Sequence, residues 1–293
     1  MVGPRPLGLA LLLALPAAAP PRRASALALW VWEAESTRMT TEPEWAARTC
    51  ERLRASGVGT LYLSPPSTEE GDAAQHRLVA WLHDRGFEVH ALFAGQDPAP
   101  VAARLGRLLE GQRSAEPSAR FDGLHFDVEP HALPTWTEAT REALARAYLD
   151  AAEGWIAQAR AADPHLRVGA ALPFWFDGLP VTWRGRLRPL NEHLQDAFDY
   201  VALMAYRNRA DGRDGLIHLA EGELAYGDRI GRPVVVGLET SPATPEKVTF
   251  HGQDAAALPR EMATARKAFE RHPSFAGFAL HHLRSWLTLI GSR

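Results

Sequence analysis

The sequence predicts an α/β protein folded as a single-domain (β/α)8 TIM barrel, and three observations lead to this fold class. A chain of 293 residues with 46% hydrophobic residues can bury one large core. Short apolar runs alternate with amphipathic segments along the chain, as in repeated βα units around a parallel sheet. No Gly-x-Gly-x-x-Gly follows the first apolar run, so the main signature of a dinucleotide-binding open sheet is missing.

The N-terminus predicts a secretory signal peptide over residues 1–26, which leaves residues 27–293 for the barrel. Arg5 precedes an apolar run from Leu7 to Ala19, and Ala24-Ser25-Ala26 offers the small residues of a cleavage site. The apolar run is too short for a stable membrane anchor. We therefore expect a periplasmic or secreted protein with no integral membrane segment once the signal peptide is removed.

The composition argues against several classes of partner. Residues 1–26 carry three arginines and no acid, so their removal changes the formal charge from −3 to −6. An acidic mature chain gives no support for binding nucleic acid or an anionic membrane. Cys50 is the only cysteine, so an intrachain disulfide is impossible. The chain has no glycine-rich phosphate-binding loop, so no cofactor is expected, and a monomer is expected.

Eight buried strands are predicted from short apolar runs that are bounded by turn residues. They cover residues 27–32, 60–63, 88–93, 123–128, 167–172, 200–204, 233–237 and 275–280. Amphipathic helical patterns follow these runs at 44–55, 73–85, 101–110, 136–162, 191–197, 216–229, 256–271 and 283–290. Eight strands and eight helical segments fit a closed barrel.

The most informative segment is the fourth predicted strand and its continuation, Phe121–Pro130. Side chains alternate between the two faces of a strand, so His125, Asp127 and Glu129 share one face and apolar residues occupy the other. Acids are rarely buried without a partner or a task. A buried charge network that only fixes the strand register is the alternative, and we favour a functional site.

Other polar and aromatic residues are predicted at the carboxyl ends of strands, where barrel enzymes build their sites. Trp32 and Glu33 follow the first strand, Trp175 follows the fifth, and Glu239 ends the seventh. Aromatic faces stack on sugars, while carboxylates bind hydroxyl groups and move protons. This ring of residues therefore indicates a carbohydrate as the binding partner.

The fourth-strand motif resembles the Asp-Gly-x-Asp-x-Asp-x-Glu motif of family 18 glycoside hydrolases, the chitinase family. Asp122, Gly123, Asp127 and Glu129 match it position by position, while His125 stands where the family has its middle Asp. The resemblance implies that Glu129 is the general acid and that Asp127 is the acid beside it. Because His125 removes one negative charge, the family's proton-sharing scheme does not carry over intact.

Two further segments resemble the same family. Met204 and Tyr206 match its sixth-strand Met-x-Tyr signature, whose Tyr helps to hold the acetamido group of the substrate. Residues 277–281 resemble the eighth strand, with His281 where the family usually places the Trp that floors the sugar site. We therefore place Met204, His281 and His125 among the substrate-binding residues.

Two glycosidase mechanisms fit these residues. In the first, the substrate's own N-acetyl oxygen attacks the anomeric carbon, Glu129 protonates the leaving oxygen, and Asp127 and Tyr206 orient the acetamido group. In the second, Glu129 and Glu239 serve as acid/base and nucleophile, which resembles the large clan of retaining glycosidases with such glutamates on strands four and seven. Carboxyl groups about 5–5.5 Å apart would suit retention, and about 6.5–9.5 Å would suit inversion.

Two other functions are considered. His125, Asp127, Glu129 and His131 offer atoms that bind divalent metals, but one short strand cannot wrap an ion, so no metal site is predicted. A non-catalytic, chitinase-like glycan-binding protein is the second alternative. The presence of Glu129 favours an enzyme, namely an exported glycoside hydrolase that acts on a polysaccharide or oligosaccharide.

Overall fold

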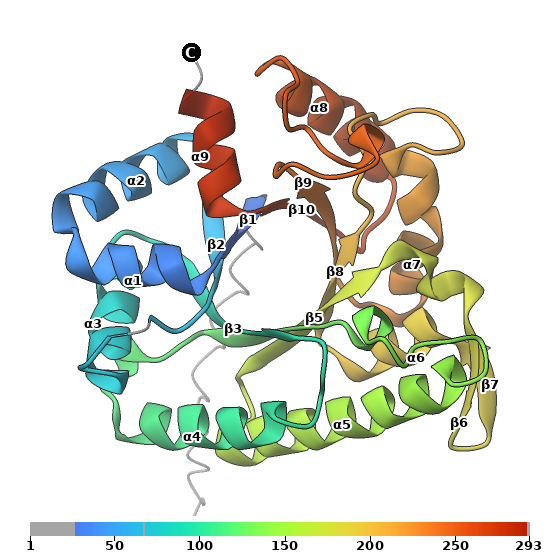
Figure 1. Ribbon diagram of the computed structural model, residues 1–293, viewed down its shortest axis with the longest axis horizontal. Helices are drawn as coiled ribbons and strands as arrows, with labels where there is room; N and C mark the ends of the chain where they lie inside the picture. The colour runs from blue at the N-terminus through green and yellow to red at the C-terminus, as the bar shows by residue number, and fades with distance from the viewer. Residues whose placement is uncertain (1–26, 67, 292–293) are drawn as a thin grey trace, which may run out of the picture.

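A closed parallel barrel forms the centre of the computed structural model (Figure 1). The structure describes residues 27–66 and 68–291, and the predicted signal peptide lies outside the described residues. The barrel strands are β1 (Leu27–Val31), β2 (Val58–Leu63), β3 (Glu88–Gly95), β4 (Gly123–Val128), β5 (Arg167–Pro173), β8 (Tyr200–Met204), β9 (Val234–Glu239) and β10 (Phe275–His281). They close in the order β1-β10-β9-β8-β5-β4-β3-β2. The predicted (β/α)8 fold is confirmed, and each strand begins and ends within two residues of its predicted limits.

Helices surround this barrel in the part of the chain that the structure describes (Figure 1). They are α1 (Glu33–Thr41), α2 (Pro43–Ala55), α3 (Asp72–His83), α4 (Val101–Ser114), α5 (Arg141–Ala162), α6 (Leu190–Ala197), α7 (Leu216–Ile230), α8 (Ala257–Phe269) and α9 (Leu283–Gly291). All the predicted helical segments are present. None of the described helices is long and apolar enough to span a membrane.

Helix α1 is absent from the predicted elements. Its segment is rich in Ser and Thr, which are weak helix formers, so the pattern gives little helical signal. Glu33 and Glu35 lie in the first turn, where negative charge interacts favourably with the helix dipole. Glu35 is buried, and its Oε1 accepts a hydrogen bond from Arg284 Nε at 2.6 Å. This contact ties α1 to α9 and explains how a weak helical segment is held.

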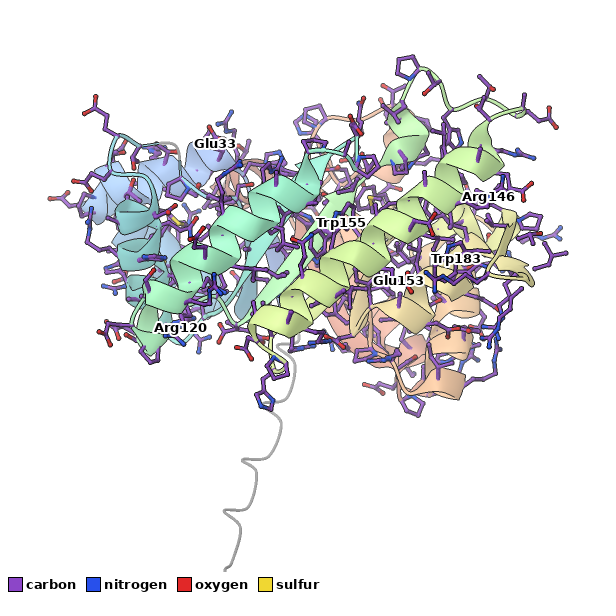
Figure 2. All side chains as sticks on the ribbon, turned by 90° about the horizontal axis from the view of Figure 1, so that it is seen from below. Glu33, Arg120, Arg146, Glu153, Trp155 and Trp183 are labelled. Atoms are coloured by element: carbon purple, nitrogen blue, oxygen red, sulfur yellow. The ribbon has the colours of Figure 1, made fainter. Side chains whose placement is uncertain are left out.

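A β-hairpin between β5 and α6 is also absent from the predicted elements. Its strands, β6 (Pro180–Trp183) and β7 (Arg186–Pro189), pair antiparallel. The turn residues Arg184 and Gly185 both have positive φ, at 51° and 73°, as the two-residue turns that favour hairpins require. Trp183 Nε1 donates to Asp150 Oδ1 of α5 at 2.9 Å, which fixes the hairpin on that helix (Figure 2).

The two faces of β4 pack into two different cores. Leu124, Phe126 and Val128 belong to the large core between the barrel and the helices. Phe126 stacks on Trp155 of α5 with 4.8 Å between ring centroids. His125 instead stacks on a barrel-interior tyrosine. The predicted alternation of this strand is confirmed, with its polar face inside the barrel.

Two glycines that face the barrel interior make room for aromatic rings. A Cβ atom at Gly123 would lie 2.8 Å from His90 Cε1, and one at Gly169 would lie 2.2 Å from Tyr200 Cε1. Cβ atoms do not approach carbon so closely. The interior of the barrel is therefore packed with rings that depend on neighbouring strands lacking side chains.

Candidate active site

Asp127 and Glu129 lie at and just beyond the carboxyl end of β4, the end at which barrel enzymes bind substrate. Asp127 is 8% exposed. Glu129 follows the strand, and its backbone N–H donates to Gly95 O at 2.8 Å. Its side chain is 37% exposed. Asp127 is therefore buried, whereas the Glu129 side chain is partly exposed to solvent.

The environment of these acids favours their protonated forms. The pKa of Asp127 is raised from 3.8 to about 7, first by burial and then by the charge of Glu129, against the lowering effects of His281 and Trp30. Burial also raises the pKa of Glu129, again against His281. Both carboxyl groups therefore hold their protons to a higher pH than free acids do.

Tyr206 follows β8 and reaches the same group of acids. Its pKa is raised by burial and then by the charges of Asp127, Glu239 and Glu129. A Cβ atom at Gly237 of β9 would lie 3.1 Å from Tyr206 Cε1, so the glycine gives this ring its space. The phenol is therefore near enough to the three carboxyl groups for their charges to raise its pKa.

Glu239 ends β9 as a buried, fully engaged carboxylate. Its Oε1 accepts hydrogen bonds from Thr240 N at 2.8 Å, Ser241 N at 2.6 Å and Ser241 Oγ at 2.6 Å. Its Oε2 lies 2.7 Å from His281 Nδ1. Burial opposes ionisation, but the contacts with His281 and Ser241 prevail and lower the pKa of Glu239. The carboxylate thus orients the His281 ring.

The His281 ring lies at the centre of an aromatic cluster at the barrel mouth. It stacks with Tyr206 at 5.9 Å between centroids and meets Trp30 and Trp32 edge-to-face at 5.8 and 5.6 Å. The neighbouring His282 also contacts Trp32, at 6.4 Å. These contacts join the ends of β1, β8 and β10 into one surface beside the acids.

His125 lies deeper in the barrel than the other selected residues. It is 0% exposed and stacks on Tyr62 with 3.7 Å between centroids. Its Nδ1 lies 3.0 Å from the Tyr200 hydroxyl. Met204, by contrast, is partly buried at the end of β8. It packs against the smaller core inside the barrel, to which Trp30 and Tyr200 belong. The structure therefore places His125 beneath the barrel mouth, against other rings.

Trp175 lies beyond β5 in a short 3₁₀ helix (Phe174–Gly178) and is 38% exposed. Its ring meets His131 edge-to-face at 5.2 Å between centroids. His131 Nε2 in turn lies 3.9 Å from Glu129 Oε1. His131 therefore lies between the exposed Trp175 ring and the Glu129 carboxyl group.

A groove of about 800 Å³ opens beside the end of β1. Trp32, Glu33, Ala94 and Arg104 are among the residues that line it. Ala94 of β3 is paired in register with Asp127 of β4. The groove thus lies against β3, the neighbour of the strand that carries the acids, and its lining includes no residue of β4. The predicted residues Trp32 and Glu33 belong to its wall.

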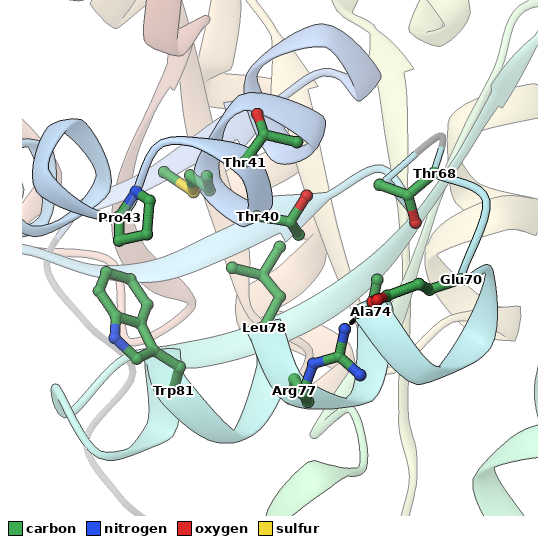
Figure 3. Close-up of a pocket in the computed structure, with 10 residues that line it drawn as sticks. Thr40, Thr41, Pro43, Thr68, Glu70, Ala74, Arg77, Leu78 and Trp81 are labelled. Atoms are coloured by element: carbon green, nitrogen blue, oxygen red, sulfur yellow. Dashed lines mark hydrogen bonds and ion pairs between the residues drawn. The ribbon is translucent and has the colours of Figure 1, made fainter.

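A second cavity, of about 360 Å³, lies in the helical layer (Figure 3). Thr40 of α1 and Leu78 and Trp81 of α3 line it, and Arg77 forms an ion pair with Glu70 there. The cavity is formed by helices and loops rather than by strand ends. It is separate from the acids of β4 and β9.

Several interior residues near the site were not selected from the sequence. They are Tyr62 of β2 and Glu88 and His90 of β3. Tyr62 stacks on His125, the His90 ring lies 6.0 Å from the Tyr62 ring, and Glu88 bonds His90. Alternation along each strand gives the signal that could have found them. The sequence does not show the register that brings these strands together.

Comparison with known proteins shows similarity of fold but identifies no family for this chain. No protein-family model matches the sequence, and no curated protein matches it. The β-1,4-mannanase of the sea hare Aplysia kurodai superposes with a TM-score of 0.57 over 94% of this chain and 91% of that chain, at 11% identity. The β-mannanase of the blue mussel Mytilus edulis gives 0.54 over 91% and 92%, also at 11% identity.

A family 18 chitinase is among the similar structures. The enzyme from Cycas revoluta, solved in complex with (GlcNAc)3, superposes with a TM-score of 0.50 over 90% of this chain and 97% of that chain, at 12% identity. Identities this low show a shared fold alone. The structural neighbours are thus glycoside hydrolases built on the same TIM barrel.

Proposed function

We propose that the protein hydrolyses a polysaccharide or oligosaccharide, with Glu129 as the general acid. The observation that carries this proposal is the pair Asp127 and Glu129 at the carboxyl end of β4, two acids whose pKa values are raised by burial. A carboxylic acid whose pKa is raised keeps its proton to a higher pH than a free acid and can donate it to a leaving oxygen. The barrel shared with mannanases and a chitinase supports the same class of reaction.

The substrate-assisted mechanism makes fuller use of this geometry. Glu129 donates its proton to the glycosidic oxygen, and the substrate's acetamido oxygen attacks the anomeric carbon. Asp127 and Tyr206 orient the acetamido group, and the charges of Asp127 and Glu129 both act on the Tyr206 phenol. The Glu129 carboxylate then takes a proton from the water that completes hydrolysis, which restores the acid. Trp175 and Trp32 offer aromatic surfaces for neighbouring sugars.

The two-carboxylate mechanism has one observation in its favour, which is that Glu239 is kept ionised at the barrel mouth. A nucleophile also needs a free lone pair directed at the sugar. Oε1 of Glu239 already accepts three hydrogen bonds, and Oε2 accepts one from His281. We therefore assign Glu239 to positioning His281. Matched N-acetylated and non-acetylated oligosaccharides separate the mechanisms, because only substrate assistance requires the acetamido group.

A comparison of turnover with binding separates an enzyme from a lectin. We expect Glu129→Gln to reduce hydrolysis of a cleaved oligosaccharide by about 10²–10⁴-fold while binding is retained. Glu138→Gln, which changes an exposed acid on the loop after β4, is the matched control and should leave turnover unchanged. Binding by the wild type with no turnover of any glycan tested would instead support the lectin alternative.

A further inference from the structure

The side chain of Arg207, which directly follows Tyr206, contacts residues from the carboxyl ends of β5 and β8. Arg207 is 9% exposed. Its Nη1 donates to Tyr206 O at 2.8 Å, and its Cζ lies 5.3 Å from the centroid of the Phe174 ring, which begins the 3₁₀ helix after β5. A buried charge is costly unless it is paired and hydrogen-bonded. The partner of Arg207 therefore decides how firmly its contact with Tyr206 is held.

Asp214 pairs with Arg207 and links it to the loop after β9. Arg207 Nε and Nη2 contact Asp214 Oδ1 at 2.8 and 2.7 Å, and Lys247 Nζ donates to Asp214 Oδ2 at 2.6 Å. The hydrogen bonds from Lys247 and then from Arg207 lower the pKa of Asp214 to about 2, so this carboxylate is ionised at neutral pH. The guanidinium is thus held by Asp214 and by the face of Phe174, while its Nη1 bonds the Tyr206 carbonyl.

Asn208 joins the loops after β8 and β9 a second time. Its backbone N–H donates to Lys247 O at 2.9 Å, and its Nδ2 donates to Thr249 O at 3.0 Å. In the loop after β9, Phe250 N in turn donates to Glu239 O at 2.9 Å. The two loops are therefore held together by side-chain and backbone bonds, with Tyr206 near the start of one and Glu239 just before the other.

We propose that Arg207 is a positioning residue that fixes the backbone of Tyr206 and thereby the placement of its phenol ring in the candidate active site. The planar guanidinium carries its donors in a fixed fork. Because Asp214 holds one edge of this fork, the donor bonded to the Tyr206 carbonyl is held as well. A lysine would supply a point charge without the fork. That the phenol orients an acetamido group rests on the proposed function, whereas the placement of the ring by Arg207 does not.

The placement of the ring is tested by ¹⁹F NMR of the full chain labelled with 3-fluorotyrosine. The chain contains five tyrosines, and the signal lost in Tyr206→Phe identifies the Tyr206 resonance. Arg207→Met and Arg207→Lys should both shift or broaden this resonance, and the lysine variant does so without a change of charge. Arg209→Met, which removes an exposed arginine from the same loop, is the matched control and should leave the resonance in place. An unchanged Tyr206 resonance in either Arg207 variant would overturn the proposal.

Asp214→Asn keeps the proposal testable if the Arg207 variants do not fold. This variant leaves the guanidinium in place but removes the charge that holds its fork. The Tyr206 resonance should therefore shift or broaden here too, and an unchanged resonance would again overturn the proposal.

Kinetics on a cleaved N-acetylated oligosaccharide show whether Arg207 acts through Tyr206. Arg207→Met should lower kcat/KM by about 10–100-fold. In a Tyr206→Phe background the same change should cost far less, because the phenol that Arg207 positions is already missing. Equal losses in both backgrounds would contradict action through Tyr206. The NMR measurement needs no glycan, so a wild type without turnover would refute the proposed function and leave the placement of Tyr206 to its own test.

Discussion

Asp127 holds a proton because its position at the end of β4 makes ionisation costly. It is buried, and the nearby charge of Glu129 opposes a second negative charge. His281, at the end of β10, acts in the opposite direction on both acids. The protonation state of the site is therefore set by residues from separate strands, which only the closed barrel brings together.

The raised pKa of Asp127 predicts a pH-dependent stability that Asp127→Asn removes. Above pH 3.8 the unfolded chain releases this proton, while the folded protein keeps it up to about pH 7. The free energy of unfolding should therefore fall as pH rises through this window, by roughly 2–4 kcal/mol. Urea unfolding at several pH values should show the slope in the wild type and a flatter profile in Asp127→Asn. Parallel profiles would show that Asp127 ionises normally in the folded state.

At the scale of single strands, the inward glycines are expected to matter as much as the rings they accommodate. Gly169→Ala would place a methyl group 2.2 Å from the Tyr200 ring, so we expect a loss of roughly 1–3 kcal/mol or more in the free energy of unfolding. Gly154→Ala is the matched control, because α5 is open there within 4 Å. It should stabilise the protein by roughly 0.5–1 kcal/mol. Chemical denaturation of both variants measures the contrast, and equal effects would contradict this packing argument.

The elements of the barrel could be predicted because each βα unit repeats a strong pattern. Buried strands such as β4 and β8 read as apolar runs of matching length, and α5 reads as an amphipathic helix. Helix α1 could not be predicted because its Ser and Thr residues are weak helix formers. It is held instead by the ion pair between Glu35 and Arg284, which is far away in the sequence. The hairpin of β6 and β7 depends on an Arg-Gly turn, which is a weaker turn signal than Asn-Gly.

The candidate site could be predicted along each strand but not between strands. Alternation places Asp127 on the inward face, and the position of Glu239 at a strand end follows from the same argument. The pairing of Glu239 with His281 depends on the register of β9 against β10. The depth of His125 likewise depends on the rings of β2 and β8, which the sequence of β4 does not reveal.

For the whole molecule, we propose export followed by removal of residues 1–26. The charge pattern and the small residues before Leu27 support this proposal. Expression of the full chain in a bacterial host should yield a mature protein that begins at Leu27 and is recovered outside the cytoplasm. Intact-mass measurement of the recovered protein gives the cleavage site. An uncleaved chain retained in the cytoplasm would contradict the proposal.

The central claim, that the barrel positions Glu129 to protonate a leaving group, is tested most directly by varying that group. Hydrolysis of an oligosaccharide and of a matched aryl glycoside with an acidic phenol leaving group should be compared in the wild type and in Glu129→Gln. A leaving group that needs no proton does not need the acid, so the variant should lose about 10²–10⁴-fold on the oligosaccharide and far less on the aryl glycoside. An equal loss on both substrates, or no loss on either, would contradict the assignment of Glu129 as the general acid.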